Sequence, residues 1–229
     1  MLAKKYRHEY KIAINHCDLL VLRQRFSILA HPDAHATGAH GLYFIRSLYF
    51  DSPEDYILRE KLDGVAYREK FRIRYYNHDT SFIQLEKKSK RDSIGKKRQA
   101  MLTLTQAECL ARGDIEWLAK SDDPLLQDFY RQCRARCLRP KTIVDYQREA
   151  YIYEPGGVRL TLDYDLRTGV NCTQMFDKDC PTVRPPDTPD ILEVKWSSFL
   201  PSIIHDAVQL ADSKQAAAFS KYAQCRLYD

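Results

Sequence analysis

Three cations alternate with bulky apolar residues in the stretch EKFRIRYYN, residues 69–77. Lys70, Arg72 and Arg74 occupy every second position. Because successive side chains of a β-strand point to opposite faces, this spacing predicts a strand with one apolar and one strongly basic face. Arginine forks and lysine ammonium groups bind phosphate oxygens, so contact with a polyanion is one interpretation of the basic face.

A solvated outer face is the plainer interpretation of one such strand, since open antiparallel sheets often turn charged residues to water. The alternation recurs, however, in several other stretches of the chain. The positions concerned are Arg7, Glu9 and Lys11, then Glu86 and Lys88, then Arg159, Thr161 and Asp163, and finally Glu193 and Lys195. Repetition of this kind predicts that the charged faces line the inside of a barrel.

The elements that must position these residues are mostly strands, with few helices in βαβ order. The predicted strands cover residues 6–14, 41–51, 66–76, 81–89, 96–104, 141–153, 157–166 and 190–196. This pattern favours an α+β protein, an eight-stranded antiparallel β-barrel with helices packed outside it.

Helices are predicted between and after these strands. They are expected in residues 15–30, 52–64, 105–113, 123–137 and 201–225. Thr105 and Glu108 stand at the spacing of a capping box, and Pro124 fits a first helical turn. Asp51 and Asp55 are expected to cap the helix that follows them rather than to bind a metal.

Composition sets outer limits on these interpretations. The chain has 229 residues, 44% hydrophobic and 29% charged, and a single domain is predicted over residues 1–229. The net charge of +5 is modest, so a polyanion site must come from cations gathered locally. Net charge by itself neither supports nor excludes nucleic acid as a ligand.

The cysteines and the N-terminal segment bear on the compartment. Seven cysteines are scattered without a paired spacing and no apolar signal region is present, which predicts a cytoplasmic protein in a reducing environment. Cys133 and Cys137 stand one helical turn apart, but no second pair completes a zinc site. His31, His35 and His40 fall in a loop with Pro and Gly, where solvated histidines are expected. No run approaches a membrane span, so a soluble chain is expected, and a membrane-protein partner is left open.

Several motifs occur in a familiar order along the chain. They are RHEYKI, SLYFDSPEDYILREKLDG, EKFRIRYYN, LEKKSK, DYQREAY, VRLTLD, ILEVK and FSKY. From Tyr6 to Tyr222 they resemble the VTC domain, the vacuolar transporter chaperone type of polyphosphate polymerase in the triphosphate tunnel metalloenzyme (CYTH-like) superfamily. The resemblance implies a tunnel whose basic interior holds ATP and inorganic polyphosphate, a divalent metal, Mn²⁺ or Mg²⁺, and a C-terminal helix at the tunnel mouth.

The resemblance also implies roles for individual arginines and an acid. Arg72 and Arg74 match paired strand arginines that hold the nucleotide phosphates. Arg148 in DYQREAY and Arg159 in VRLTLD match two further phosphate-contacting arginines. Glu193 in ILEVK matches the acid associated with the metal, and carboxylate oxygens suit a hard cation.

Lysines of the motifs are expected to contact the substrate. Lys11 shares its predicted face with Glu9, a second candidate metal ligand, and Lys195 shares the face of Glu193. Lys88 matches the lysine of LEKKSK. Lys97 is a weaker match, because Lys96 and Arg98 flank it and a one-residue slip would exchange the two faces.

Lys221 in FSKY matches a lysine on the final helix at the tunnel mouth. Lys214 lies seven residues earlier and would project from nearly the same face of one continuous helix, although a solvated lysine is an equal alternative. Asp163 is placed either near the metal or as a partner of an interior arginine.

Two positions depart from the family pattern. Hydrolases of the superfamily start with ExExK, whereas this chain has Arg7 at the first acidic position. One carboxylate fewer favours a polymer-forming enzyme over a hydrolase. Ala218 stands where some of the polymerases carry a second lysine.

Three functions are compatible with these residues. The favoured hypothesis is an ATP-dependent phosphotransferase that extends inorganic polyphosphate, with no nucleic acid partner expected. Hydrolysis of triphosphate or short polyphosphate in the same tunnel is the second, and a non-catalytic module that binds polyphosphate, inositol phosphates or nucleic acid is the third. The physiological acceptor, the oligomeric state and any regulatory ligand are left open.

Overall fold

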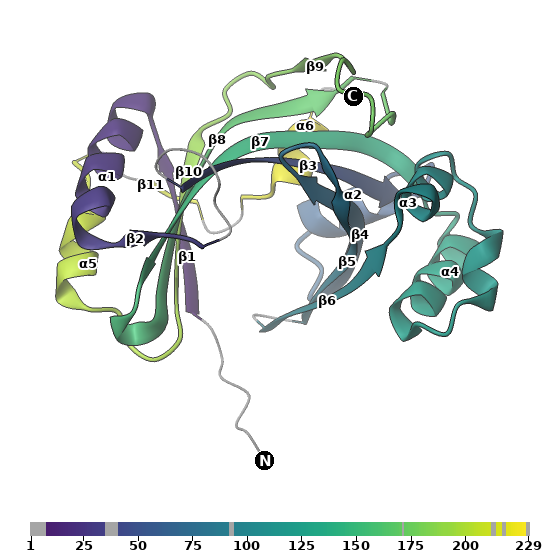
Figure 1. The fold of residues 1–229 in the computed structure, drawn as a ribbon, viewed down its shortest axis with the longest axis horizontal. Coiled ribbons are helices and arrows are strands. Elements are labelled where there is room, and N and C mark those ends of the chain that lie inside the picture. Colours follow the sequence, from purple (N-terminus) through teal and green to yellow (C-terminus); the bar gives the residue numbers. More distant parts are fainter. Residues whose placement is uncertain are drawn as a thin grey trace. The chain divides into compact units, whose positions relative to one another are not determined.

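The computed structural model describes residues 8–34, 41–91, 94–170, 172–211, 214–216 and 219–227. Arg7, His35, His40 and Ala218 lie outside these ranges. The chain divides into two compact units, each assembled from separate segments (Figure 1). Unit 1 comprises Met1–Phe44, Tyr146–Leu166 and Pro186–Phe219, and unit 2 comprises Ile45–Asp145, Arg167–Pro185 and Ser220–Asp229.

Long antiparallel strands form most of the described structure, as the sequence predicts. The strands of seven or more residues are β1 (His8–Ile14), β3 (Leu42–Asp51), β4 (Tyr67–Tyr76), β5 (Asp79–Arg91), β6 (Ile94–Leu102), β7 (Arg139–Tyr153), β8 (Val158–Gly169) and β10 (Asp190–Trp196). Three two-residue strands join them, namely β2 (His31–Pro32), β9 (Thr182–Val183) and β11 (Lys214–Gln215). The eight predicted strands are therefore confirmed.

The strands pair in the order β11-β1-β10-β8-β7-β3-β4-β5-β6, with β2 beside β7 and β9 beside β8. This order has two ends, and within the described ranges no pairing between them closes the sheet. At one end, β11 has only two residues and pairs with β1. The α+β class and the antiparallel sheet with outer helices are confirmed, but the hydrogen bonds do not form a closed barrel.

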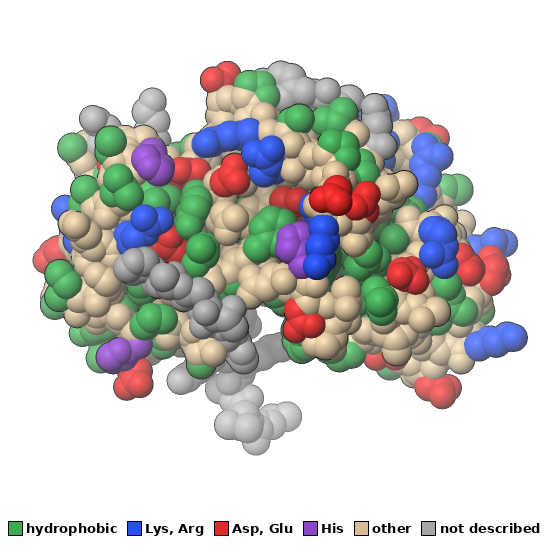
Figure 2. Space-filling model, turned by 45° about the horizontal axis from the view of Figure 1, so that its top comes forward, with side chains coloured by type: hydrophobic (Ala, Val, Ile, Leu, Met, Phe, Trp, Pro, Cys, Tyr) green, Lys and Arg blue, Asp and Glu red, His purple; other side chains and the backbone are tan. Residues whose placement is uncertain are grey.

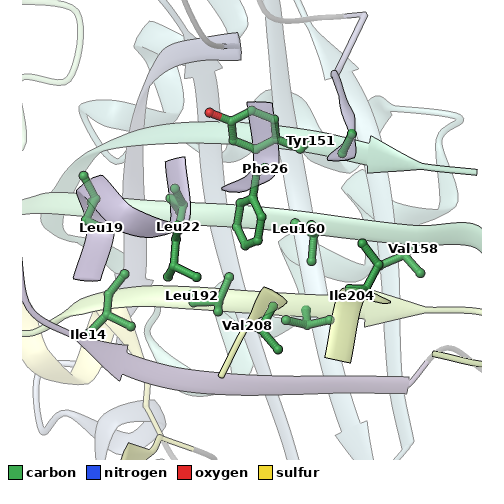
Figure 3. Close-up of a cluster of buried hydrophobic side chains, with 13 residues drawn as sticks. Ile14, Leu19, Leu22, Phe26, Tyr151, Val158, Leu160, Leu192, Ile204 and Val208 are labelled. Atoms are coloured by element: carbon green, nitrogen blue, oxygen red, sulfur yellow. The ribbon is translucent and has the colours of Figure 1, made fainter. Parts of the chain in front are cut away.

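An apolar core in unit 1 covers one face of β1, β8 and β10 (Figure 3). Helix α1 (His16–Leu29) begins with a capping box between Asn15 and Asp18, and it buries Leu19, Leu22 and Phe26. These three residues follow helical spacing and pack with β-strand leucines and with α5 (Ser202–Ala207). Because strand side chains alternate, the residues between the buried ones point to the opposite face.

A second core, in unit 2, covers one face of β3 and β4. Helix α4 (Pro124–Arg136) is capped by Asp123, whose carboxylate accepts hydrogen bonds from two backbone amides of the first turn. The ring centroid of Phe129 on α4 lies 4.9 Å from those of both Phe50 and Phe71. Phe71 and Arg72 are successive residues of β4, so the helix covers the face opposite to Arg72.

Helix α3 (Leu104–Ala111) and the 3-10 helices η2 (Glu116–Lys120) and η3 (Pro155–Gly157) complete the short elements between strands. The capping box of α3 is formed by Thr103 and Gln106. The prediction that Thr105 and Glu108 form it is wrong, because the helix starts one residue before Thr105.

Asp51 at the end of β3 ties two helices of unit 2 together. Its carboxylate accepts hydrogen bonds from the backbone amides of Ile57 and Leu58 in α2 (Tyr56–Leu62), at 2.8 and 3.1 Å. The hydroxyl of Tyr222 in α6 (Lys221–Cys225) donates to the same carboxylate at 2.5 Å. The predicted capping role is confirmed for Asp51. Asp55 makes no such bond and instead accepts from Arg226.

The C-terminal segment is not one helix. Helix α5 ends at Ala207, β11 pairs with β1, and α6 starts at Lys221. The backbone amide of Ala216 donates to the carbonyl of Lys11 at 2.8 Å, so this part of the chain hydrogen-bonds to the sheet instead of continuing α5. The predicted continuous helix over residues 201–225, and with it the shared helical face of Lys214 and Lys221, is wrong.

The structure joins Cys172 and Cys180 in a disulfide, which the scattered cysteine spacing does not predict. In the described part of the chain, no helix has the length and apolar character needed to cross a membrane. On the face drawn in Figure 2, acidic and basic side chains are interspersed, which fits the modest net charge.

We expect Phe129→Ala to destabilise the protein by about 3–5 kcal/mol, because it leaves a cavity between α4 and the aromatic residues of β3 and β4. Urea unfolding followed by circular dichroism measures this loss. Arg131→Ala on the exposed side of the same helix is the control and should stay within about 0.5 kcal/mol of the parent. Equal stability of the two variants would contradict the packing described here.

Candidate functional site

One face of β4, β5 and β6 in unit 2 carries the predicted lysines side by side. The strand register pairs Lys70 with Lys88, and Lys88 with Lys97. Directly paired residues of antiparallel strands share a face, so the three lysines form one row across three strands. The sequence left open whether Lys97 or its neighbours Lys96 and Arg98 share the face of Lys88. The strand pairing shows that Lys97 does.

The neighbouring residues Lys96 and Arg98 have the opposite orientation. Arg98 and the buried Lys87 both contact Asp128 of α4, at 3.4 and 2.9 Å. Lys87 also lies 2.7 Å from Glu69. These ion pairs belong to the helix-covered face of the sheet, and the alternation of charges gives no sign of them because their acidic partner lies on a distant helix.

Arg72 is held in one orientation by two partners within unit 2. Its Nε and Nη2 atoms lie 2.7 and 2.5 Å from the Oε2 atom of Glu86, its register partner on β5. Its Nη1 atom donates to the hydroxyl of Tyr49 at 2.7 Å. All three side chains are buried, so the guanidinium is oriented before any ligand arrives.

Arg74 lies on the same face as Arg72, one strand repeat further along β4. Its Nε atom donates to the hydroxyl of Ser47 at 3.0 Å, and Ser47 is its register partner on β3. The two arginines that the sequence assigns to phosphate are thus both on one buried face, and each is supported by a hydroxyl of β3 that the sequence analysis did not single out.

Helix α6 reaches this face through an aromatic contact. The ring of Tyr222 stacks on that of Tyr49 with centroids 4.9 Å apart. Lys221, the first residue of α6, directly precedes Tyr222. Tyr222 packs on Tyr49, and Tyr49 accepts a hydrogen bond from Arg72. Lys214 belongs to a different element, β11, where its backbone pairs with Ala13.

Glu86 is the carboxylate at the centre of this basic face. Besides Arg72 it contacts Lys97. Burial by itself would raise the pKa of Glu86, but the charges of Arg72, Arg74 and Lys97 outweigh that effect and hold the pKa well below its ordinary value. The carboxylate is therefore ionised at neutral pH and balances part of the positive charge.

A second charged face lies on β1, β10 and β8 in unit 1, opposite to the apolar core. Two cross-strand rows make it up. The first row is Glu9, Lys195 and Arg159, and the second is Lys11, Glu193 and Thr161. Five of these residues are sequence-predicted site residues, and the register brings them onto one surface.

Glu193 stands at the centre of this face and contacts two lysines. Lys11 Nζ lies 3.3 Å from its Oε1 atom, and Lys195 Nζ lies 2.5 Å from its Oε2 atom. Glu9 contacts the same two lysines, at 3.2 and 3.8 Å. Burial would lower the pKa of Lys11, but Glu193 and Glu9 outweigh it and the pKa is raised. Lys11 is therefore charged at neutral pH.

Arg148 of β7 is paired with Asp163 of β8. Its Nε and Nη2 atoms lie 2.5 and 2.6 Å from the two carboxylate oxygens, a bidentate arrangement that fixes the guanidinium plane. Burial opposes its charge, but Asp163 raises the pKa of Arg148 well above the ordinary value. Of the two roles considered for Asp163, partnership with an arginine is confirmed, and Glu193 lies 3.9 Å from the same guanidinium.

Arg159 has different partners. Its Nη2 atom lies 2.8 Å from a carboxylate oxygen of Asp33 and 3.1 Å from the hydroxyl of Tyr43. Sequence reasoning missed Asp33, which follows a short strand in a segment that the sequence describes only as a loop with histidines. The sequence signal at Asp33 is that an acid beside a proline is common in turns, and this does not predict a contact with Arg159.

Thr161 carries a buried hydroxyl without a hydrogen-bond partner. The residue is 1% exposed. An unsatisfied buried hydroxyl costs about 1–3 kcal/mol, so native structures usually provide a partner. The neighbours of Thr161 on this face are Glu193 across the strands and Arg159 and Asp163 along its own strand.

The donor chemistry of this face fits a hard divalent cation in part. In the described ranges, no three Asp, Glu, His or Cys side chains are grouped closely enough to hold one ion. Glu9 and Glu193 share two lysine partners and so lie near each other. Mg²⁺ is commonly held by one or two carboxylates together with water and substrate phosphate, and two glutamates satisfy that need.

We expect the stability difference between the parent and Glu86→Gln to depend on pH. A carboxyl whose pKa is lowered on folding contributes stability above its unfolded pKa of about 4.3, and that contribution is lost as pH falls below this value. The variant should be about 1.5–3 kcal/mol less stable at pH 7 and should approach the parent in acid. Urea unfolding at pH 7, 5, 4 and 3 measures the difference, with exposed Glu154→Gln as control. A difference that stays constant with pH would contradict the ion pair.

Comparison with solved structures identifies the fold. A proposed adenylate cyclase from Bacillus halodurans aligns over 89% of this chain and 84% of its own, with 13% sequence identity and a TM-score of 0.51. A protein from Pyrococcus horikoshii OT3 aligns over 89% of this chain and 84% of its own, with 13% identity and a TM-score of 0.43. A proposed adenylate cyclase from Vibrio parahaemolyticus covers 88% of this chain and 82% of its own, with 8% identity and a TM-score of 0.44.

At 13% identity, the similarity to the Bacillus halodurans protein shows a shared fold only. No curated protein matches the chain. Residues 6–228, nearly the whole sequence, match the VTC domain. The chain therefore belongs to the VTC domain family.

Proposed function

We propose that the protein is a polyphosphate polymerase, which transfers the γ-phosphate of ATP to the end of a growing inorganic polyphosphate chain. Membership of the VTC domain family supports a nucleotide or polyphosphate as substrate. The two charged sheet faces supply the groups that such a substrate needs. ATP and polyphosphate are the proposed partners, and the cytoplasm is the proposed location.

The observation that carries this proposal is the excess of cations on the unit 2 face. By register, the described basic residues there are Arg68, Lys70, Arg72, Arg74, Lys88, Lys90 and Lys97. Against these seven cations, the register places two described acids of β4, β5 and β6 on this face, Glu86 and, beyond a register shift, Asp79 beside Tyr76. A triphosphate carries about four negative charges, so a longer polyanion accounts better for a row that continues beyond Arg72 and Arg74.

Phosphoryl transfer relies mainly on positioning and on stabilisation of charge. Arg72 and Arg74 are proposed to hold the phosphates of ATP, since Glu86, Tyr49 and Ser47 fix their orientation. A terminal oxygen of the polyphosphate chain attacks the γ-phosphorus, and the bond from that phosphorus to the β,γ-bridging oxygen breaks. The products are ADP and a chain longer by one phosphate.

The unit 1 face is proposed to bind phosphate and a divalent cation. Arg148 and Arg159 contribute guanidinium groups that are already oriented by Asp163 and Asp33. Glu193 and Glu9 would hold Mn²⁺ or Mg²⁺, and either ion would supply positive charge to the phosphate oxygens. The lysines that now contact these two glutamates are then available to bind phosphate.

Lysines are proposed to guide the polymer. Lys88 and Lys97 continue the basic row past the arginines, and Lys11 and Lys195 do the same on the other face. Lys221 is proposed to contact the polyphosphate near α6. Lys214 is retained as a candidate contact from β11, without the helical relation to Lys221 that the sequence suggested.

Loss of both arginines should abolish tight triphosphate binding. In Arg72→Ala, Arg74→Ala, each lost charge-assisted contact is expected to weaken binding by about 1.5–3 kcal/mol. Titration calorimetry with ATP and with inorganic triphosphate measures the change, and circular dichroism checks that the fold is retained.

The matched control for this variant is Lys96→Ala, Arg98→Ala. It removes the same number of charges from β6, which is separated from β4 by β5 in the same sheet, but from the opposite face. Binding should change little in the control. An equal loss of affinity in both double variants would mean that net charge, and not the orientation of the arginines, controls binding.

Products resolved on a gel test the reaction itself. Incubation of the parent with ATP and Mn²⁺ should give long chains rather than free phosphate alone. Lys221→Ala should give shorter chains with little change in ATP affinity, and the defect should deepen with salt because exposed cations contact the polyanion. Lys120→Ala, on exposed η2, is the control. Free phosphate as the parent's only product would identify a hydrolase instead.

A further inference from the structure

The hydroxyl of Thr161 is the clearest unexplained polar group on the unit 1 face. Its Oγ1 atom is buried and has no hydrogen-bond partner among the described residues. It lies on β8 between Arg159 and Asp163, on the side of the strand opposite to the apolar core. A hydroxyl left unpaired at this depth indicates that something absent from the protein alone completes the site.

Two other buried threonines on the strands, Thr142 and Thr168 in unit 2, show the usual arrangement. Thr168, further along β8, donates to the carbonyl of Cys225 at 3.2 Å and lies 3.1 Å from the hydroxyl of Thr142. Burial within the sheet therefore does not by itself leave a threonine unpaired. The difference lies in the surroundings, because Thr161 faces a charged surface and Thr168 faces other protein groups.

The nearest register neighbour of Thr161 is the proposed cation ligand Glu193 on β10. Directly paired residues of antiparallel strands have Cβ atoms about 4.5–5.5 Å apart, close enough for their oxygens to bind one ion. Asp163, two residues along β8, is a second acidic neighbour on the same face.

We propose that the Thr161 hydroxyl oxygen is a ligand of the divalent cation held by Glu193. This rests on the proposed function, which assigns a cation to that glutamate. Mg²⁺ and Mn²⁺ prefer oxygen donors, and a neutral hydroxyl supplies one without adding a charge. The site then consists of Glu9, Glu193 and Thr161 from three consecutive strands, β1, β10 and β8, with water and phosphate oxygens in the remaining positions.

A bound cation explains the unpaired hydroxyl of Thr161 better than a bound phosphate does. Thr161 is the register partner of Glu193, whose negative charge would repel a nearby phosphate oxygen and would attract a metal ion. The phosphate-binding cations Lys11, Lys195 and Arg159 lie at neighbouring positions of the two rows, where phosphate groups bound to the ion can reach them.

The test measures binding of Mn²⁺ alone, by calorimetry and by the electron paramagnetic resonance signal of free Mn²⁺. Thr161→Val keeps the shape of the side chain and removes the oxygen, and it should weaken Mn²⁺ binding at least about tenfold. Thr161→Ser restores the oxygen and should bind Mn²⁺ nearly as the parent does. Glu193→Gln should also bind Mn²⁺ more weakly.

Two controls separate this role from a structural one. Thr161→Val should unfold thermally at the same or a higher temperature than the parent, since no hydrogen bond is lost. Thr168→Val should unfold at a lower temperature, because it removes a satisfied hydroxyl, and should bind Mn²⁺ as the parent does. Binding of inorganic triphosphate in the presence of a chelator should be the same for Thr161→Val and the parent.

The outcomes are distinct. If Glu193→Gln loses Mn²⁺ affinity and Thr161→Val does not, the proposal for Thr161 is overturned while the proposed function stands. If Thr161→Val instead loses triphosphate affinity in chelator, the hydroxyl is a phosphate donor and the proposal is again overturned. Absence of Mn²⁺ binding by the parent would overturn both the Thr161 ligand and the cation assigned to Glu193.

Discussion

The buried ion pair between Arg72 and Glu86 is the interaction on which the unit 2 face depends. A strand that places Lys70, Arg72 and Arg74 on one side repels itself unless a counter-charge lies within the face. Glu86 provides that charge, and it is itself ionised because the surrounding cations hold its pKa down. A buried pair of this kind adds little net stability but makes the loss of either partner costly, so its main effect is to fix orientation.

The other contacts of this face follow from the orientation of Arg72. Its guanidinium also donates to Tyr49, Tyr49 stacks on Tyr222, and Tyr222 donates to Asp51 at the end of β3. The position of α6 is thereby connected to the side chain proposed to hold ATP. The opposite face of the same strands is filled by the aromatic core around Phe129, so the strands cannot rotate their charged face away.

In unit 1, cations are likewise oriented by ion pairs with carboxylates, and more residues take part. Arg148 has Asp163, Arg159 has Asp33, and the two lysines share Glu9 and Glu193. Charge is balanced locally across this face, so binding of a phosphate or a cation exchanges one set of ion pairs for another instead of placing a bare charge in the interior. Thr161 is the exception, because its hydroxyl has no such partner in the described structure. The unpaired hydroxyl of Thr161 therefore indicates a ligand site more directly than the paired charges around it do.

The alternation of charged and apolar residues along the chain determined where the strands lie and which residues share a face. Period-two spacing correctly placed Arg72 and Arg74 on one side, and Glu9 with Lys11, because side-chain direction in a strand is a local property. The choice of Lys97 over its neighbours needed the pairing of β6 with β5, which no local pattern contains. The partners Asp33, Tyr49 and Ser47 come from distant segments and were likewise fixed only by folding. At the C-terminus, helical spacing led to a wrong prediction. There β11 forms because it can pair with the open edge of β1, and local propensity contains no information about such a tertiary contact.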